Sequence, residues 1–285
     1  MNHLAELKLH QYMTDAVKGK STISDEVINQ VADDVRDSLQ RQFGGKVKRK
    51  DFRLRMSNIG RPTCQLWYEK NKPETALPRS NNFMMNMMLG DIVEAVFKGL
   101  LRGAKVEYED SDDVVLKLKD SEVSGSYDLV IDGAVDDVKS ASDWSYKNKF
   151  DSYETLSKGD GFGYVGQLAG YAKASGKKVG GWWVVNKANG HFKYVPASGL
   201  DLDEEIAKIE ATVATVNTNK FERCFEPEIE TFRGKTTGNT VLNSNCRFCD
   251  YRYDCWNLTD MPAVMSKAKL PKTVSYIELA NNASS

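Results

Sequence analysis

Long apolar runs are missing from this sequence of 285 residues. The longest run near its middle, Trp182 to Val185, falls far short of the roughly 20 residues that a transmembrane helix needs. The first residues, Met1 to Met13, mix polar and apolar side chains and do not resemble a secretory signal. Internal repeats and low-complexity segments are lacking as well. We therefore expect a folded cytoplasmic protein without a membrane partner.

An excess of charge of either sign is also lacking. The chain has 39 lysine and arginine residues against 40 aspartate and glutamate residues, so its formal net charge is −1. Attraction to nucleic acid would have to come from local patches. With 41% hydrophobic and 28% charged residues, the composition is that of an ordinary globular chain. Its length suits one large domain, with or without a small appendage.

Only five cysteines are present, yet three of them lie close together. Cys246 and Cys249 form a CxxC motif, and Cys255 follows shortly after it. This spacing is typical of zinc, iron–sulfur and redox sites, and a four-coordinate site needs one more ligand. Cys64 is the best fourth ligand, and Cys224 is a spare candidate that we interpret as a structural or free thiol. The spacing argues against the alternative that these cysteines are merely buried small hydrophobic residues.

Hydrophobic periodicity and turn residues predict a mixed α/β domain around a central sheet. Ser24 is the expected N-cap of a first helix, and Gly44-Gly45 and Ser175-Gly176 are expected to end helices. The predicted helices cover 25–39, 81–101, 164–174 and 201–216. The predicted strands lie within 106–139 and at 179–186 and 191–195. Turns are predicted at 111–113 and 132–133, inside the first of these strand regions.

The most informative segment contains Asp132-Gly133 between two β-prone runs, which predicts a two-residue hairpin turn. Counting outward pairs Asp128 with Asp137, and Lys139 shares their face because side chains alternate along a strand. Two facing carboxylates repel each other, and Mg²⁺ or Mn²⁺ bound between them would remove the repulsion. The alternative is a solvent-exposed acidic hairpin, and a bulge would change the pairing.

Five short motifs follow one another between Ser57 and Trp256. They are Cys64, the segment Gly90 to Glu94, the segment Gly125 to Asp128, the tripeptide Asp137-Val138-Lys139, and Gln167 to Tyr171 with the CxxC motif behind it. In this order they resemble the RecB-like branch of the PD-(D/E)XK nuclease superfamily. Within it, the chain is most similar to the CRISPR-associated exonuclease family with a four-cysteine iron–sulfur cluster, which has stand-alone relatives in phages. Glu94 stands where many relatives have histidine, a substitution that the wider superfamily also permits.

The resemblance implies a metal-dependent DNA nuclease. The expected activity is that of an exonuclease on single-stranded DNA or DNA ends, in recombination, repair or phage DNA metabolism. Glu94, Asp128 and Asp137 would hold one or two Mg²⁺ or Mn²⁺ ions, with the carbonyl of Val138 as a further ligand. Lys139 would orient the attacking water and stabilise charge on the phosphate.

The resemblance also assigns Gln167 and Tyr171 to the positioning of DNA near the metal, and their spacing of four places them on one helical face. A buried amide and a core tyrosine are the alternative. A 4Fe–4S cluster is implied at Cys64, Cys246, Cys249 and Cys255, although Zn²⁺ could fill the same ligands. Candidate DNA contacts are Arg53, Arg55, Arg61, Lys147 and Lys158, with Trp144 or Tyr146 stacking on bases of a single strand.

Arg53 and Arg55 end a basic run that begins at Lys46 and includes Lys48, Arg49 and Lys50. The run reads either as a solvated loop or strand or as a phosphate-contacting patch.

The implied fold is a restriction-endonuclease-like PD-(D/E)XK core, a mixed central sheet flanked by helices. We predict an N-terminal helical segment over 1–56, a nuclease domain closed by the four-cysteine cluster over 57–262, and a C-terminal tail over 263–285. One alternative is a catalytically silent nucleic-acid-binding module of the same fold in a recombination or packaging complex. Another is a zinc-stapled structural or regulatory protein. If a phage encodes the chain, the host cytoplasm is the expected location and a recombination protein an expected partner.

Overall fold

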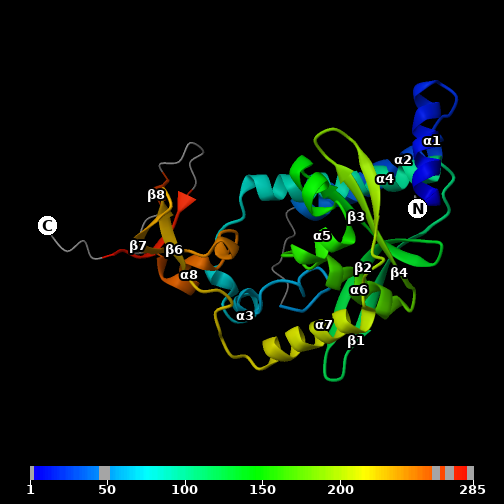
Figure 1. Cartoon of the computed structure of the whole chain (residues 1–285). Coiled ribbons are helices and arrows are strands. Elements are labelled where there is room, and N and C mark those ends of the chain that lie inside the picture. Colours follow the sequence, from blue (N-terminus) through cyan, green and yellow to red (C-terminus); the bar gives the residue numbers. More distant parts are fainter. Residues whose placement is uncertain (1–2, 45–51, 259–263, 267–272, 281–285) are drawn as a thin grey trace. The chain divides into compact units, whose positions relative to one another are not determined.

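A computed structural model of the chain describes residues 3–44, 52–258, 264–266 and 273–280 (Figure 1). The chain forms two compact units, one from residues 1–61 and 80–214 and the other from residues 62–79 and 215–285. This division differs from the predicted boundaries at 56 and 262. The helices before residue 57 belong to the first unit, and the segment that begins at Pro62 folds with the C-terminal part of the chain.

The first unit is built on a mixed sheet of five strands in the order β1-β2-β3-β4-β5. Neighbouring strands are antiparallel except β3 and β4, which are parallel and joined by a crossover through α5 and α6. The prediction of a mixed α/β domain around a central sheet is confirmed. The elements are β1 (Glu109–Lys117), β2 (Glu122–Ile131), β3 (Ala134–Ala141), η2 (Ser145–Lys149), α5 (Tyr153–Lys158), α6 (Tyr164–Ser175), β4 (Lys178–Asn186) and β5 (Phe192–Pro196).

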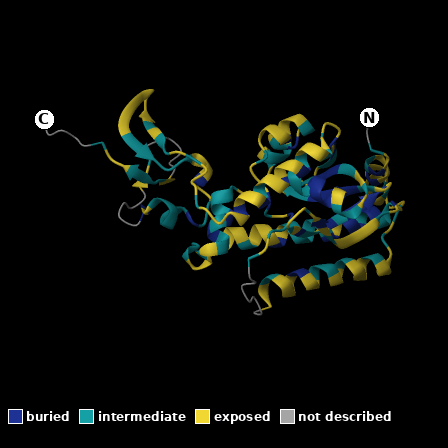
Figure 2. Ribbon diagram, turned by 90° about the horizontal axis from the view of Figure 1, so that it is seen from below, coloured by how far each residue is buried: buried dark blue, intermediate teal, exposed yellow. Residues whose placement is uncertain are grey.

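Helices cover both faces of this sheet (Figure 1). On one face, α1 (Leu4–Val17) and α4 (Asn81–Gly103) pack against a cluster of strand residues that includes Leu129 and Trp183. On the other face, α6 and α7 (Leu202–Asn217) pack against a cluster that includes Val130 and Trp182. Buried residues gather in the strands in Figure 2, whereas α2 (Asp25–Phe43), which packs on α4, is largely exposed. The sheet therefore separates two apolar cores.

Several predicted element ends agree with the structure. Ser24 caps α2 by accepting a hydrogen bond from the backbone N–H of Val27, and Gly176 ends α6 in the left-handed conformation. The predicted turn at 111–113 is wrong, because these residues lie within β1 and the chain turns at 118–121. Serine and aspartate favour turns, but here they are exposed positions of an edge strand, where charged side chains discourage pairing with other chains.

The second unit combines α3 (Thr63–Asn71) and η1 (Pro73–Thr75) with the elements that follow α7. η3 (Ser244–Cys246), α8 (Arg252–Trp256) and the turn between them carry three of the cysteines. The segment predicted as a tail contains short strands. They are β8 (Val264–Met265) paired with β9 (Thr273–Val274), and β10 (Tyr276–Glu278), which joins β7 (Lys235–Val241) and β6 (Glu228–Phe232) in a small antiparallel sheet.

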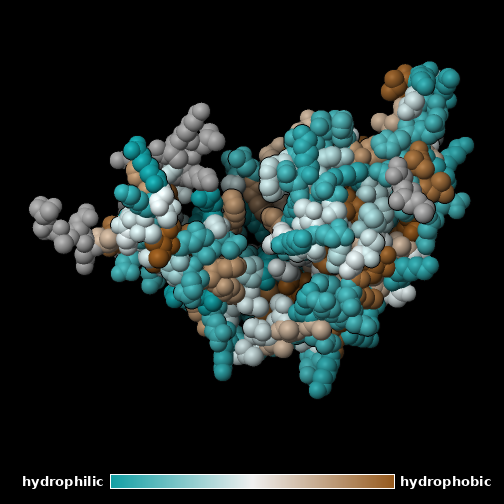
Figure 3. All heavy atoms as spheres, in the orientation of Figure 1, coloured by the Kyte–Doolittle hydropathy of each residue, from teal (hydrophilic) through white to brown (hydrophobic). Residues whose placement is uncertain are grey.

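The described helices include none that is long and apolar enough to cross a membrane. On the face drawn in Figure 3, hydrophilic residues predominate and hydrophobic residues occur in small separate groups. Scattered apolar residues of this kind are normal on a globular surface.

A candidate carboxylate–lysine site and a cysteine cluster

The β2–β3 hairpin forms as the Asp-Gly turn predicted. Asp132 and Gly133 both have positive φ, and the strands pair Ile131 with Ala134 and Leu129 with Asp136. This register places Asp128 opposite Asp137, one step beyond the last paired residues. There the carboxylate Oδ2 of Asp128 accepts a hydrogen bond from the backbone N–H of Val138 at 2.7 Å. A side chain of β2 thus takes the place of a backbone acceptor, and its carboxylate is held beside β3.

Asp137 and Lys139 lie on the same face of β3 and form an ion pair. The Asp137 side chain is only 2% exposed, and its Oδ2 lies 2.6 Å from the Lys139 Nζ. Lys139 Nζ also donates a hydrogen bond of 3.4 Å to Oε1 of Gln167, whose Nε2 donates to the hydroxyl of Tyr171 at 3.0 Å. The prediction that Gln167 and Tyr171 share one face of a helix is confirmed, and that face of α6 meets Lys139.

Glycine at position 125 in β2 makes this packing possible. A Cβ there would lie 2.6 Å from the Tyr171 ring and 2.8 Å from Cγ of Met56. Any larger residue would push α6 away from the sheet. The close packing of Tyr171 and Met56 therefore explains why the Gly125-to-Asp128 motif begins with glycine.

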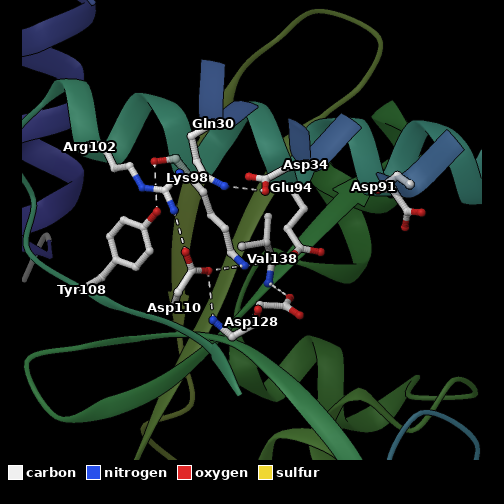
Figure 4. Close-up of polar contacts among 12 residues, drawn as sticks. Gln30, Asp34, Asp91, Glu94, Lys98, Arg102, Tyr108, Asp110, Asp128 and Val138 are labelled. Carbon is white, nitrogen blue, oxygen red and sulfur yellow. Dashed lines mark hydrogen bonds and ion pairs between the residues drawn. The ribbon is translucent and has the colours of Figure 1, made fainter. Parts of the chain in front are cut away.

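Glu94 approaches from α4, and its carboxylate points toward Asp128 in Figure 4. Its Oε1 lies 2.9 Å from the Nζ of Lys98, one helical turn away, and that ammonium also lies 3.0 Å from Oδ1 of Asp110. Lys98 is 5% exposed, a rare burial for a lysine that the paired carboxylates make tolerable. Sequence reasoning missed Lys98, although its spacing of four from Glu94 was a usable signal.

Mutual repulsion and burial make ionisation of these carboxyl groups costly. Burial, followed by the charge of Asp137, raises the pKa of Asp128 to about 7. Burial and the charge of Asp128 raise the pKa of Glu94, and burial raises that of Asp137 against the opposing effect of Lys139. For Lys139, burial favours the neutral amine, but the charges of Asp137 and Asp128 outweigh it and raise its pKa. The ammonium is therefore charged at neutral pH.

This donor set suits a hard divalent cation. Carboxylate oxygens are the preferred ligands of Mg²⁺ and Mn²⁺, and such an ion would offset the burial and the repulsion that raise the three pKa values. Among the described residues, no three aspartate, glutamate, histidine or cysteine side chains lie close enough together to bind a metal ion without rearrangement. The ammonium groups of Lys139 and Lys98 compensate the carboxylates instead. Glu94, Asp128 and Asp137 are the residues that would hold the ion.

Asp136, next to Asp137, faces the opposite side of the sheet. Its carboxylate accepts hydrogen bonds from the backbone N–H of Gly181 at 2.8 Å, the Tyr194 hydroxyl at 2.9 Å and the Trp183 indole N–H at 3.1 Å. The register of β3 and β4 shifts at this point, where a Cβ on Gly180 would lie 2.0 Å from Asp136 Oδ1. Gly180 leaves room for the buried Asp136 carboxylate, and Gly181 donates a hydrogen bond to it. We assign Asp136 a structural role that the sequence did not indicate.

The four predicted cysteine ligands gather in the second unit. Cys64, Cys246, Cys249 and Cys255 line one cavity of about 30 Å³, together with aromatic residues. One wall is formed by Tyr68 of α3 and Tyr251, whose rings stack with centroids 5.3 Å apart. The backbone N–H of Leu77 donates to the carbonyl of Asp250 at 2.9 Å, and Lys72 pairs with Asp254 at 3.1 Å. The segment around Cys64 is thus joined to the segment of the CxxC motif, as the sequence predicted.

Cys224 is a fifth sulfur in this group. Its Sγ accepts a hydrogen bond from the backbone N–H of Cys64 at 3.1 Å, and the Thr63 hydroxyl lies 3.4 Å away. A thiol hydrogen bond from Cys64 lowers the pKa of Cys224 to about 6 and raises that of Cys64, while burial raises the pKa of Cys249 to about 11. Cys224 therefore competes with Cys64 for the fourth ligand position. The spacing of the cysteines in the sequence did not indicate the contact between Cys224 and Cys64.

The predicted DNA contacts lie on several elements of the first unit. Trp144, at the start of η2, is 68% exposed, and Lys147 forms an ion pair of 2.8 Å with Asp143. Tyr146 is less available, because the Lys193 ammonium lies 4.5 Å from its ring centre. Arg53 and Arg61 are exposed, Arg55 is half-buried, and Lys158 ends α5. Lys46, Lys48, Arg49 and Lys50 lie outside the described residues.

Comparison with known proteins adds little. No family model matches the sequence, and no curated protein matches it. Among solved structures, that of SSO0001 is similar over 68% of this chain and 88% of its own length, at 13% identity and a TM-score of 0.39. A likeness at this level carries no argument about function.

Proposed function

We propose that this chain is a metal-dependent DNA nuclease with a PD-(D/E)XK core. The observation that carries the proposal is that Asp128, Asp137 and Lys139 lie close together at the end of the β2–β3 hairpin opposite its turn. Glu94 approaches them from α4. Residues far apart in the sequence supply three carboxylates and one ammonium, the groups that phosphodiester hydrolysis with a divalent cation needs. Gln167 and Tyr171 extend the same contact network.

The protein's own groups would divide the work as follows. A bound Mg²⁺ or Mn²⁺ supplies an acidified water and charge neutralisation at the phosphate. Lys139 stays protonated, so it acts by electrostatic stabilisation and orientation rather than as a base. Gln167, itself fixed by Tyr171, holds the Lys139 ammonium in position. Lys98 fixes the Glu94 carboxylate from the buried side.

The proposed substrate is single-stranded DNA or a DNA end, and the proposed setting is recombination, repair or phage DNA metabolism. Exposed basic residues such as Arg53 and Arg61 would contact phosphates. In the second unit, four of the five cysteines would hold a 4Fe–4S cluster or Zn²⁺ with a structural role, because they connect segments that are distant in the sequence.

The test is cleavage of end-labelled DNA by Lys139→Ala, compared with the wild type in Mg²⁺ and in Mn²⁺. We expect a loss of at least about 100-fold in rate, by analogy with the loss of one charge-stabilising group elsewhere, with DNA binding in EDTA retained. Lys173→Ala, which removes a half-exposed lysine of α6, should cleave like the wild type. Undiminished cleavage by Lys139→Ala would refute the assignment. A wild type that binds DNA but cuts none would favour a catalytically silent binding module.

A further inference from the structure

Three aromatic rings form a stack that leads from the core of the first unit to its surface. Phe150 is buried, Tyr164 is half-buried and Phe162 is 69% exposed. The ring of Tyr164 is stacked with that of Phe150, at 5.7 Å between centroids, and with that of Phe162, at 5.6 Å and an interplanar angle of 14°. The exposed ring of Phe162 is thus supported by two further rings that lead into the core.

The loop that carries Phe162 holds the ring in place. The carboxylate of Asp160 accepts a hydrogen bond from the backbone N–H of Val165 at 2.8 Å, and Gly163 has a φ of +73°. A Cβ on Gly163 would lie 2.4 Å from the Cα of Gly60, so the loop approaches its neighbour as only glycine permits.

A largely buried lysine side chain lies against the same rings. The ammonium of Lys149 lies 4.6 Å from the Phe162 ring centre and 4.5 Å from that of Tyr164. Its side chain is only 12% exposed, so cation–π attraction acts there with little competition from water. The ring of Phe162 is therefore set in position before any ligand arrives.

This stack adjoins the candidate site. The ammonium of Lys139 lies 5.0 Å from the ring centre of Tyr164, so a single ring separates Phe162 from the lysine that would contact the phosphate. A strand whose phosphate lay at Lys139 would bring a neighbouring base within reach of the Phe162 ring.

We propose that Phe162 is a stacking platform for one unpaired base of a strand bound at the site. The inference deepens the proposed function and rests on it. Only a base freed from its duplex partners offers a whole face to a protein ring. Glycines and an aspartate flank Phe162 in its loop, so the exposed part of the stack is a single ring, which matches the size of a flat base.

The experiment measures binding of short single-stranded DNA to the full chain in EDTA, where no cleavage interferes. Phe162→Ala should weaken binding by roughly tenfold, the loss of one base stack, without changing the salt dependence, because no phosphate contact is removed. Phe162→Trp should restore it. Phe43→Ala, at another exposed phenylalanine of the same unit, should bind like the wild type. A series of DNA strands, each with one abasic site at a different position, should include one strand that the wild type and Phe162→Ala bind with equal affinity.

Wild-type affinity of a folded Phe162→Ala variant, or an equal loss on every abasic strand, overturns the platform. So does a Phe162→Trp variant that stays as weak as the alanine variant. These results are separable from the failure of the proposed function. A wild type that binds single strands through Phe162 but never cleaves refutes the nuclease and leaves the platform standing. A Phe162→Ala variant that binds and cleaves single strands as well as the wild type refutes the platform alone.

Discussion

Asp136 and Asp137 are neighbours in β3, yet they serve opposite purposes because side chains alternate across a strand. Asp136 meets three hydrogen-bond donors and is fully supplied with partners. Asp137 meets a lysine and the repulsion of Asp128 and Glu94. A buried carboxyl group surrounded by donors has its partners within the fold, whereas one that faces other carboxylates favours a bound cation. This difference separates the structural aspartate from the site residue.

The pH dependence of stability tests the role of Asp136. Burial raises its pKa to about 7, against the effect of its hydrogen bonds, while an unfolded aspartate has a pKa of about 3.9. The folded state therefore binds more protons between these values. Its contribution to the free energy of unfolding is full below about pH 4 and declines by up to about 4 kcal/mol as the pH rises through 7. Asp136→Asn should flatten this decline in urea denaturation of the metal-free protein.

The control for that measurement is Asp132→Asn, because Asp132 is exposed at the hairpin turn and asparagine tolerates its positive φ. This variant should keep the wild-type decline of stability with pH. If Asp136→Asn keeps it too, Asp136 does not carry a raised pKa and its assignment is wrong.

At the scale of elements, the shifted register of β3 and β4 makes room for the buried Asp136 carboxyl group. β4 carries Gly180 and Gly181 at the shift, and Asp136 fits against them. Gly180→Ala would place its Cβ 2.0 Å from Asp136 Oδ1 and 2.7 Å from the carbonyl oxygen of Val135. We expect destabilisation of more than about 2 kcal/mol in urea denaturation, since backbone must move.

Gly166→Ala provides the contrast for Gly180→Ala. Gly166 lies in α6, and the nearest atom to a Cβ there, Glu205 Oε2, is 3.8 Å away. Alanine at this helical position should stabilise by up to about 1 kcal/mol. Equal stability of the two variants would show that the register shift tolerates a side chain.

Local chemistry explains which elements the sequence could predict. The Asp132-Gly133 turn determines the register of its own hairpin, and a spacing of four places Gln167 and Tyr171 together without reference to the rest of the chain. The prediction of a turn at 111–113 was wrong because these residues pair with β2 as exposed positions of an edge strand, despite their preference for turns. The contact of Cys224 with Cys64 and the burial of Lys98 arise from packing between distant segments, which spacing alone does not reveal.

At the scale of the whole molecule, the second unit is assembled from two segments that lie on either side of residues 80–214 in the sequence. Bringing together the ends of so long a loop costs chain entropy, which a metal or cluster bound by both segments would offset. The chain therefore has a physical reason to place Cys64 before the sheet and the CxxC motif after it. A cysteine site with this stabilising role should be dispensable for the chemistry at Lys139.

The fourth ligand can be identified from metal content. If Cys64 is the ligand, Cys64→Ser purified without oxygen should lose most of its iron or zinc in elemental analysis, and Cys224→Ser should keep it. Cys64→Ser should also melt at a lower temperature, since the two segments lose their link. The reverse result, a depleted Cys224→Ser and a loaded Cys64→Ser, would assign the position to Cys224.

Binding of Mn²⁺ to the metal-free protein, followed by electron paramagnetic resonance, tests most directly whether Glu94, Asp128 and Asp137 form a cation site. We predict saturable binding of one or two ions at pH 8, above the raised pKa of Asp128. Asp137→Asn should abolish this binding, and Asp132→Asn should leave it intact. Binding that survives Asp137→Asn unchanged, or no binding by the wild type, would contradict it.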